Sequence, residues 1–465
     1  MNSLTVAVLM NQIFRRRSAW YFTHLSDKYG PIVRIAPGEV MITSADTLRS
    51  INAVQSRYRR GPFFTAFRFI PNRDNIFSFQ SDADHSSRRS RMAPGYLGRG
   101  VSSYDEIIDE QLTRVFALID RKYVCSSTCS ENRTMDLNAI SYFYPLDVIG
   151  SIALGRPFGY LDDGVDLYRF KAVNDKFFIY AVTLACVPSV MTLLQKWPLS
   201  LLMPKDSDTS GFGKIIGVSA KIIDERLLPG AKPRKDMLQA FIAAGLSRDE
   251  LIQESIVQIV AGTDTIGSTI RTVFACLLSS PPAYSRVAKE IRDRDTEDSI
   301  SSPVTEAQCR SLPYLQAVLR ESMRLYPPLT ALAFKQVPPG GDILAGHFLP
   351  EGTQVGQNIY GILRDPKTWG VDGNSFVPER WLGQPEEHEK EMQAALDLTF
   401  GYGKYKCLGQ RLAIAEVSKF LVEFLRRYDF AAAVTHDPLH LAAAFGWPSD
   451  RFLLRITYRC RESKI

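Results

Sequence analysis

The stretch FGYGKYKCLG, residues 400–409, places Cys407 between two glycine-containing turns and directly before an apolar helical pattern. A helix N-terminus offers free backbone N–H groups and a positive dipole end, and both stabilise a thiolate. Gly403 and Gly409 are expected to let the backbone pass close to a planar group, where a Cβ would clash. The loop therefore predicts a thiolate presented from one side to a flat cofactor, although a buried, inert cysteine fits the same residues.

The pattern F-G-x-G-x-x-x-C-x-G resembles the haem-binding loop of the cytochrome P450 family. The resemblance implies that Cys407 is the axial ligand of the iron of haem b (iron protoporphyrin IX). It also implies that Phe400, Gly401, Tyr405 and Gly409 are cofactor-binding positions. A thiolate ligand donates electron density to the iron and favours O–O cleavage.

A second segment, Ala261–Thr265 (AGTDT), lies in a long helical pattern with apolar residues at helical spacing on both sides. Ser247 and Glu250 are spaced as a capping box at its start, and Pro281 follows its end. The predicted helix has about 33 residues and a length of about 50 Å, which suits a helix that crosses a whole domain.

An acid and an alcohol are adjacent in the middle of this helix, where both are poor helix formers. The resemblance assigns Asp264 and Thr265 as the catalytic pair that delivers protons during oxygen activation. Small Ala261 and Gly262 are expected to leave room for dioxygen and substrate. A solvated Asp264 beside a Thr265 that bonds the helix backbone is the alternative.

Two further segments match the family in its order. Residues 312–328 predict a helix that begins at Pro313 and carries Glu321 and Arg324 on one face. The segment FVPERW contributes Arg380, and the resemblance implies a buried structural network of Glu321, Arg324 and Arg380 under the cysteine loop. An exposed Glu–Arg pair of little energetic value is the alternative.

The resemblance extends to the N-terminal part. Residues 29–40 resemble the first β-strands of fungal members, and residues 85–96 resemble a helix whose side chains bind a haem propionate. By this resemblance His85 and Arg89 anchor the haem.

The sequence departs from the family at two propionate-binding positions. Tyr405 replaces an arginine two residues before the cysteine, and Lys335 replaces a second arginine. Neither residue offers the bidentate fork of a guanidinium, so weaker haem binding is one expectation. Compensation by the flanking Lys404 and Lys406 is the other.

The resemblance implies a mainly α fold with small β-regions, the cytochrome P450 fold, with the long central helix over the haem. The expected division is an N-terminal segment, residues 1–28, and a catalytic domain, residues 29–465. The apolar stretch Leu4–Met10 is too short for a membrane span, which needs about 20 residues. The charged stretches 293–298 and 385–390 are expected to be surface loops.

Composition excludes several other classes of protein. The 465-residue chain has a net charge of +6 and no basic run, which argues against nucleic-acid binding. Its seven cysteines are odd in number and scattered, so no disulfide framework is predicted, and no zinc-binding spacing occurs. The chain is expected to be a monomer.

An uncharged stretch, residues 177–194, is interrupted by Pro188 and followed by the apolar residues Trp197, Leu201 and Leu202. It resembles the substrate-access helices of the family. It predicts either peripheral contact with a membrane interface or a core helix with an apolar loop. By family resemblance, the expected location is the cytosolic face of the endoplasmic reticulum membrane.

The candidate substrate pocket is aromatic and apolar with almost no charge, which predicts a lipophilic small-molecule substrate. By resemblance its residues are Phe63, Phe64, Phe67, Phe77, Phe79, Ala261, Thr330, Ala331, Leu332 and Phe445.

Taken together, the resemblance implies a monooxygenase that inserts one oxygen atom from O2 into such a substrate, and fungal secondary-metabolite biosynthesis is the expected setting. Electrons are expected from NADPH through NADPH–cytochrome P450 reductase, with cytochrome b5 as a second donor, because the chain has no evident flavin or nicotinamide motif. The reductase is expected to dock on the cysteine side, near Lys404, Lys406 and Arg411, which otherwise are solvated cations. Alternatives are a reductase-independent isomerase or dehydratase and a non-catalytic haem-binding protein.

Overall fold

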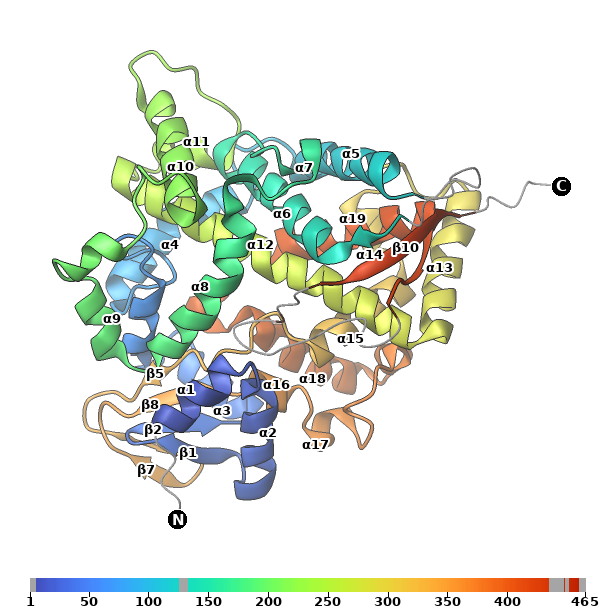
Figure 1. Cartoon of the computed structure of the whole chain (residues 1–465). Coiled ribbons are helices and arrows are strands. Elements are labelled where there is room, and N and C mark those ends of the chain that lie inside the picture. Colours follow the sequence, from blue (N-terminus) through green and yellow to red (C-terminus); the bar gives the residue numbers. More distant parts are fainter. Residues whose placement is uncertain (1–5, 125–132, 435–446, 448–450, 460–465) are drawn as a thin grey trace.

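The computed structural model describes residues 6–124, 133–434, 447 and 451–459 (Figure 1). Helices dominate these ranges, and the described strands form three small sheets. The predicted mainly α class with small β-regions is therefore confirmed. Phe445, one of the expected pocket residues, lies outside the described residues.

The central helix α12 (Arg248–Ser279) has 32 residues and runs through the middle of the molecule (Figure 1). The Ser247–Glu250 capping box is formed as predicted. Helix α12 packs most extensively against α6 (Leu137–Leu154). Among the described residues, α6 is the one helix long and apolar enough to cross a membrane, but 89% of it is buried in the protein core.

The remaining helices surround this pair. In chain order they are α1 (Val6–Phe14), α2 (Ser18–Tyr29), α3 (Ala45–Asn52), α4 (Asp82–Tyr96), α5 (Tyr104–Lys122), α7 (Tyr160–Asp163), α8 (Phe170–Ala185), α9 (Pro188–Leu194), α10 (Gly211–Leu227), α11 (Met237–Ala243), α13 (Pro281–Thr296), α14 (Glu306–Arg310), α15 (Pro313–Leu325), α16 (Ile359–Ile362), α17 (Pro366–Trp369), α18 (Glu386–Leu396) and α19 (Gln410–Arg427). Short 3-10 helices are η1 (Pro62–Phe67), η2 (Leu167–Arg169), η3 (Leu199–Leu202), η4 (Pro378–Trp381), η5 (Asp397–Phe400) and η6 (Gly403–Tyr405).

The largest sheet has the strand order β1-β2-β8-β5-β3 and lies near the N-terminus (Figure 1). Its strands are β1 (Ile32–Ala36), β2 (Glu39–Ile42), β8 (Gln354–Gln357), β5 (Lys335–Gln336) and β3 (Arg59–Arg60). The antiparallel register of β3 and β5 places Arg60 directly opposite Lys335. The other sheets are β4 (Met135–Asp136), β10 (Leu453–Tyr458) and β9 (Tyr428–Ala432), and the hairpin of β6 (Asp342–Leu344) and β7 (His347–Leu349).

The N-terminal helices lie against the rest of the chain. Helix α1 buries Leu9 and Ile13 and contacts α8 and β1, and α2 contacts β1 and α16. The uncharged stretch 177–194 is interrupted as predicted: α8 ends at Ala185, and α9 begins at Pro188.

Two expected surface loops are instead largely helical. Residues 293–296 end α13, and residues 386–390 begin α18. Charge does not prevent a helix when it lies on the exposed face, and the ion pairs Lys289–Asp293 and Lys390–Glu386 have the favourable i,i+4 spacing. Acidic residues in the first turn of α18 also favour its N-terminus.

Candidate active site

A cavity of about 350 Å³ lies between α12 and the cysteine loop, a volume typical of small-molecule pockets. Its lining comes from segments far apart in the sequence. It includes all the predicted catalytic and cofactor-binding residues: His85, Arg89, Asp264, Thr265, Lys335, Phe400, Gly401, Tyr405, Cys407 and Gly409. The tertiary fold therefore brings together residues that were predicted from separate sequence motifs.

The cysteine loop is fixed by its own backbone. The Cys407 N–H donates to the Phe400 carbonyl at 2.7 Å, and α19 begins three residues later at Gln410. Burial raises the pKa of the Cys407 thiol, while the Gly409 backbone N–H and the Arg89 charge act in the opposite direction. The sulfur thus faces a cavity from a helix start, as an axial thiolate ligand requires.

The glycines serve helix packing more than was expected. A Cβ at Gly403, whose φ is +58°, would lie 2.0 Å from the Asn52 carbonyl oxygen of α3. At Gly262 it would lie 3.1 Å from Cγ1 of Ile149 on α6. Gly403 is therefore required by the approach of α3, whereas a side chain at Gly262 would only press on Ile149 of α6. The Cβ position of Gly409 has only contacts of 3.9 Å and remains open toward Cys407.

Asp264 and Thr265 of α12 show features of both interpretations, the proton-delivering pair and the pair without a catalytic role. Asp264 is not solvated: burial raises its pKa to about 7, and Asn174 Nδ2 donates to its Oδ2 at 2.7 Å. The Thr265 hydroxyl donates to the Ala261 carbonyl at 2.8 Å, the backbone bond of the alternative interpretation. Both residues nevertheless border the cavity with Cys407.

Opposite these groups, buried cations surround the ring of Tyr405. The Arg60 guanidinium lies 4.5 Å from the ring centroid, and Lys335 Nζ lies 3.2 Å from it. The Tyr405 hydroxyl donates to Asp82, which also pairs with Lys404 at 2.5 Å. Lys404 is thus bound to Asp82 and is not turned toward the cavity as a spare cation.

Sequence reasoning missed Arg60. It lies in a two-residue strand, which shows no periodicity, and the only sequence signal is the pair Arg59-Arg60 before an aromatic run. Arg60 reaches the site because β3 pairs with β5. It supplies the guanidinium that the substitutions at 335 and 405 had removed.

Asp82 is a carboxylate whose charge acts on Arg60 and Lys335, but Lys404 and the Tyr405 hydroxyl already bind it. Among the described residues, Arg60, Arg89 and Lys335 form no ion pair, yet all three line the cavity. Burial, followed by the charges of Arg60 and Arg89, lowers the pKa of His85 to about 3, so His85 is neutral. Like charges opposite each other on paired strands are unfavourable, and buried charges require a partner. The cavity therefore fits a ligand that brings carboxylates to this side, as the two propionates of haem do, and a soft iron to Cys407.

The sequence profile of the family described as Cytochrome P450 matches residues 3–456. The chain belongs to the cytochrome P450 family. It is 32% identical over 450 residues to Cytochrome P450 monooxygenase aba1 of Botryotinia fuckeliana, covering 97% of this chain and 88% of the relative. It is 34% identical to ABA1 of Pyricularia oryzae, covering 88% and 80% of the two chains, and 27% identical to Pisatin demethylase of Fusarium vanettenii, covering 86% and 78%.

Membership of the family means a haem-thiolate protein, and the residues on the cavity wall fit that group. Among the residues that the structure describes, Cys407 is the one cysteine of the cavity lining, so it is the residue that would ligate the iron. Arg60, Arg89 and Lys335 would hold the propionates. The Arg89 Nη1 group also donates to the Lys406 carbonyl at 2.7 Å, which ties α4 to the cysteine loop.

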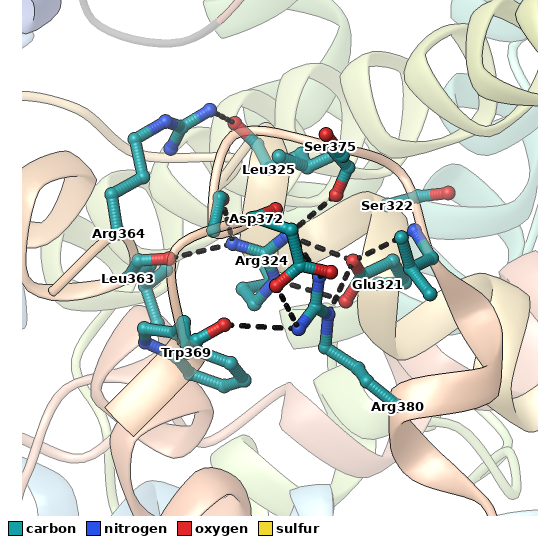
Figure 2. A network of polar contacts seen from close by, with 12 residues as sticks. Glu321, Ser322, Arg324, Leu325, Leu363, Arg364, Trp369, Asp372, Ser375 and Arg380 are labelled. Atoms are coloured by element: carbon teal, nitrogen blue, oxygen red, sulfur yellow. Dashed lines mark hydrogen bonds and ion pairs between the residues drawn. The ribbon is translucent and has the colours of Figure 1, made fainter. Parts of the chain in front are cut away.

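The predicted Glu–Arg network forms in this cytochrome P450, with Glu321 and Arg324 buried and Arg380 half-buried (Figure 2). Glu321 accepts from Arg324 at 2.8 and 2.9 Å and from Arg380 Nε at 2.9 Å. Trp381 Nε1 donates to the same carboxylate at 2.9 Å. All the N–H groups of Arg324 are used, because it also donates to three backbone carbonyls, those of Leu363, Gly373 and Ser375. The alternative of an exposed pair is wrong.

The network does not touch the cysteine loop itself. Among the described residues, its hydrogen bonds join α15 to the segment 363–381. The route to the cysteine loop is indirect: Arg320 of α15 pairs with Glu389 of α18 at 3.4 Å, and α18 leads into η5. The network thus holds α15 against the segment 363–381, and α15 in turn contacts α18, which precedes the cysteine loop.

The expected pocket is corrected at several positions. Phe64, Phe67, Phe77 and Ala261 line the cavity, but the following expected residues do not: Phe63, Phe79, Thr330, Ala331 and Leu332. Phe63 packs against Phe334, and Phe79 lies 5.3 Å from the Arg88 guanidinium. After the Pro pair, the chain turns Leu329 and Ala333 to the cavity instead. Other lining residues that were not predicted include Phe69, Ile149, Phe178, Val260 and Thr269.

Proposed function

We propose that this chain is a monooxygenase that inserts one oxygen atom from O2 into a lipophilic small molecule of fungal secondary metabolism. Bound haem b would supply dioxygen activation and O–O cleavage. The observation that carries the proposal is the shared cavity, in which a cysteine at a helix start faces a buried acid and an adjacent alcohol. Relatives named as cytochrome P450 monooxygenases over nearly the whole chain support it.

Each residue of the cavity has a proposed role that follows from its position. Cys407 would hold the iron from the α19 side. Asp264, with a pKa raised to about 7 by burial, is suited to give and regain a proton near neutral pH. Thr265 would pass that proton on. The aromatic side chains of Phe64, Phe67 and Phe77 would bind the apolar body of the substrate and exclude water.

Electrons would come from NADPH through NADPH–cytochrome P450 reductase, with cytochrome b5 as a second donor. The proposed docking face is the cysteine side. Lys406 is exposed there, and Arg411 is exposed although it pairs with Glu306 at 3.1 Å. Lys404 no longer belongs to this set, because its side chain is only 11% exposed and is bound by Asp82.

Membrane association is typical of the fungal family, and the endoplasmic reticulum surface is the proposed location. Exposed apolar side chains gather between α8 and η3, and Trp197 and Leu202 are each 80% exposed. Lys196 and Lys205 are exposed nearby, as at a membrane interface. Binding to vesicles containing anionic lipid should weaken when Trp197 and Leu202 are replaced by serine, and unchanged binding would remove this surface from the proposal.

Isotope labelling tests the reaction. The haem-loaded protein, its reductase and NADPH would be incubated with a panel of apolar fungal metabolites under ¹⁸O2. A product that contains one ¹⁸O atom and depends on NADPH is expected. Turnover without NADPH would favour the reductase-independent isomerase or dehydratase, and absence of any NADPH-dependent product would favour a non-catalytic haem protein.

A further inference from the structure

Asp264 is bonded across the cavity roof to a different helix. Asn174 of α8 is 1% exposed, and its Nδ2 donates to Asp264 Oδ2 at 2.7 Å. The Asn174 Oδ1 atom is buried without a hydrogen-bond partner in the described part of the chain. Thr265 meanwhile bonds its own helix backbone. The Asp264 carboxyl is therefore hydrogen-bonded to α8, and the hydroxyl of the adjacent Thr265 is bonded to the Ala261 carbonyl instead of to Asp264.

Helix α8 connects this contact to both the solvent and the cavity. Lys171, Asn174 and Phe178 are spaced three and four residues apart, so they share one face of α8. Phe178 lines the cavity. Lys171 pairs with Asp175 at 2.6 Å, with side chains that are 14% and 39% exposed. The Asn174–Asp264 bond lies between a solvent-accessible ion pair and a side chain in contact range of substrate.

We propose that Asn174 is a positioning residue that holds the Asp264 carboxyl at the α8–α12 interface and releases it when substrate against Phe178 shifts α8. The proposal rests on the proposed function. After release, the Asp264 O–H gives its proton to Thr265 Oγ, while the hydroxyl proton of Thr265 passes to a basic oxygen of the molecule bound in the cavity, which leaves Asp264 as a carboxylate. Asp264 then regains a proton from solvent past Lys171 and Asp175. No electrons are transferred in these steps.

The electrostatics agree with this role. The Asn174 N–H bond stabilises the charged carboxylate and so lowers the pKa of Asp264, opposing the larger effect of burial. Removal of that bond should raise this pKa further. The other charged or titratable groups that face Asp264 are Lys171 and Asp175 of α8, Arg271 of α12 and Tyr142 of α6.

An infrared pH titration of the haem-loaded protein tests the contact without any substrate. The band of the protonated Asp264 carboxyl would be assigned by its loss in Asp264→Asn. In the unchanged protein its midpoint is expected near pH 7. In Asn174→Leu the midpoint should move to higher pH and the band frequency should change. The matched control is Gln111→Leu, which removes another buried amide, on α5, and should leave the band unchanged.

Turnover of the substrate found by ¹⁸O labelling tests the release step. Asn174→Leu should lower kcat by about ten- to a hundredfold with KM nearly unchanged, increase the solvent isotope effect and divert NADPH electrons to hydrogen peroxide. Asn174→Asp should restore coupling, because a protonated carboxyl can donate the same hydrogen bond.

An unmoved Asp264 band in Asn174→Leu would overturn the proposal. So would a loss of coupling that Gln111→Leu reproduces or that Asn174→Asp fails to restore. If no NADPH-dependent product is found at all, the monooxygenase proposal fails, and the infrared titration still decides whether Asn174 positions Asp264.

Discussion

Two buried charge clusters in this protein are built in opposite ways. Around Glu321, two arginines and Trp381 surround one carboxylate. Backbone carbonyls accept the remaining N–H groups of Arg324, and Figure 2 shows both arginines beside Glu321. Around Tyr405, Arg60 and Lys335 form no ion pair in the described part of the chain, and the nearby Asp82 is already bound by Lys404 and the Tyr405 hydroxyl. The first cluster is neutralised by the chain itself, whereas the second has room for an anionic ligand.

The difference shows how burial distinguishes structure from function. A buried charge without a partner costs several kcal/mol, so a chain keeps one only where something else compensates. Glu321 and its partners need nothing further and stabilise the scaffold. Arg60 and Lys335 face a cavity and form no ion pair within the described ranges, which is why we propose them as partners of the haem propionates.

The largest effect is expected from the ligand itself. Replacement of Cys407 by Ala should abolish thiolate-ligated haem completely, because no other cysteine lines the cavity among the described residues. The helical fold should persist, since the Cys407 side chain is not part of the packed core. Haem content and circular dichroism of the purified variant check this, and a surviving thiolate spectrum would contradict the assignment.

Breaking the complete cluster should destabilise the fold. Glu321→Ala leaves the Arg324 charge buried without its partner and should lower the free energy of unfolding by about 3–5 kcal/mol. The matched control is Asp372→Ala, which removes a half-exposed partner of Arg380 and should cost less than about 1 kcal/mol. Denaturant unfolding measures both. Equal costs for the two variants would mean that the network is not a single buried unit.

Breaking the incomplete cluster should spare the fold and weaken the ligand. Arg60→Ala removes a charge-assisted hydrogen bond to a propionate, worth about 1.5–3 kcal/mol, so haem should dissociate about 10- to 100-fold faster. The haem-free protein should lose little stability, because removing one of two facing cations offsets the loss of the Arg60 hydrogen bond to the Ile76 carbonyl. Arg59→Ala, on the exposed side of the same strand, is the control and should leave haem release unchanged. Slower or unchanged haem loss in Arg60→Ala would contradict the propionate assignment.

The smallest effect sharpens the comparison. The sequence alone suggests that an arginine restored at position 405 should tighten haem binding. In the structure both Arg60 and Lys335 lie against the Tyr405 ring, so Tyr405→Arg adds a third cation and should speed haem loss a few-fold, the scale of a lost cation–π contact. Tyr405→Phe keeps the ring and should change haem release less. Tighter binding in Tyr405→Arg would show that the cluster still lacks positive charge.

Features written in local sequence could be predicted. The capping box of α12, the start of α15 at Pro313 and the cysteine before α19 depend on neighbouring residues, and all three were found. The Glu321 network was also predicted, because its members lie in recognisable motifs.

Features created by tertiary pairing were missed. Arg60 enters the site through a two-residue strand, and Asn174 reaches Asp264 from 90 residues away. Neither carries a periodic signal. The wrongly predicted pocket residues have a related cause. In an irregular segment such as 329–333, the backbone conformation decides which side chains face the cavity, and the sequence alone does not determine that conformation.

The most direct test is the absorption difference spectrum of the purified, reduced protein with and without carbon monoxide. A strongly red-shifted Soret band is expected if, as proposed, Cys407 is the thiolate ligand in a cavity whose cations bind the propionates. A band typical of histidine- or thiol-ligated haem would contradict this, and would mean that Cys407 is not the thiolate ligand.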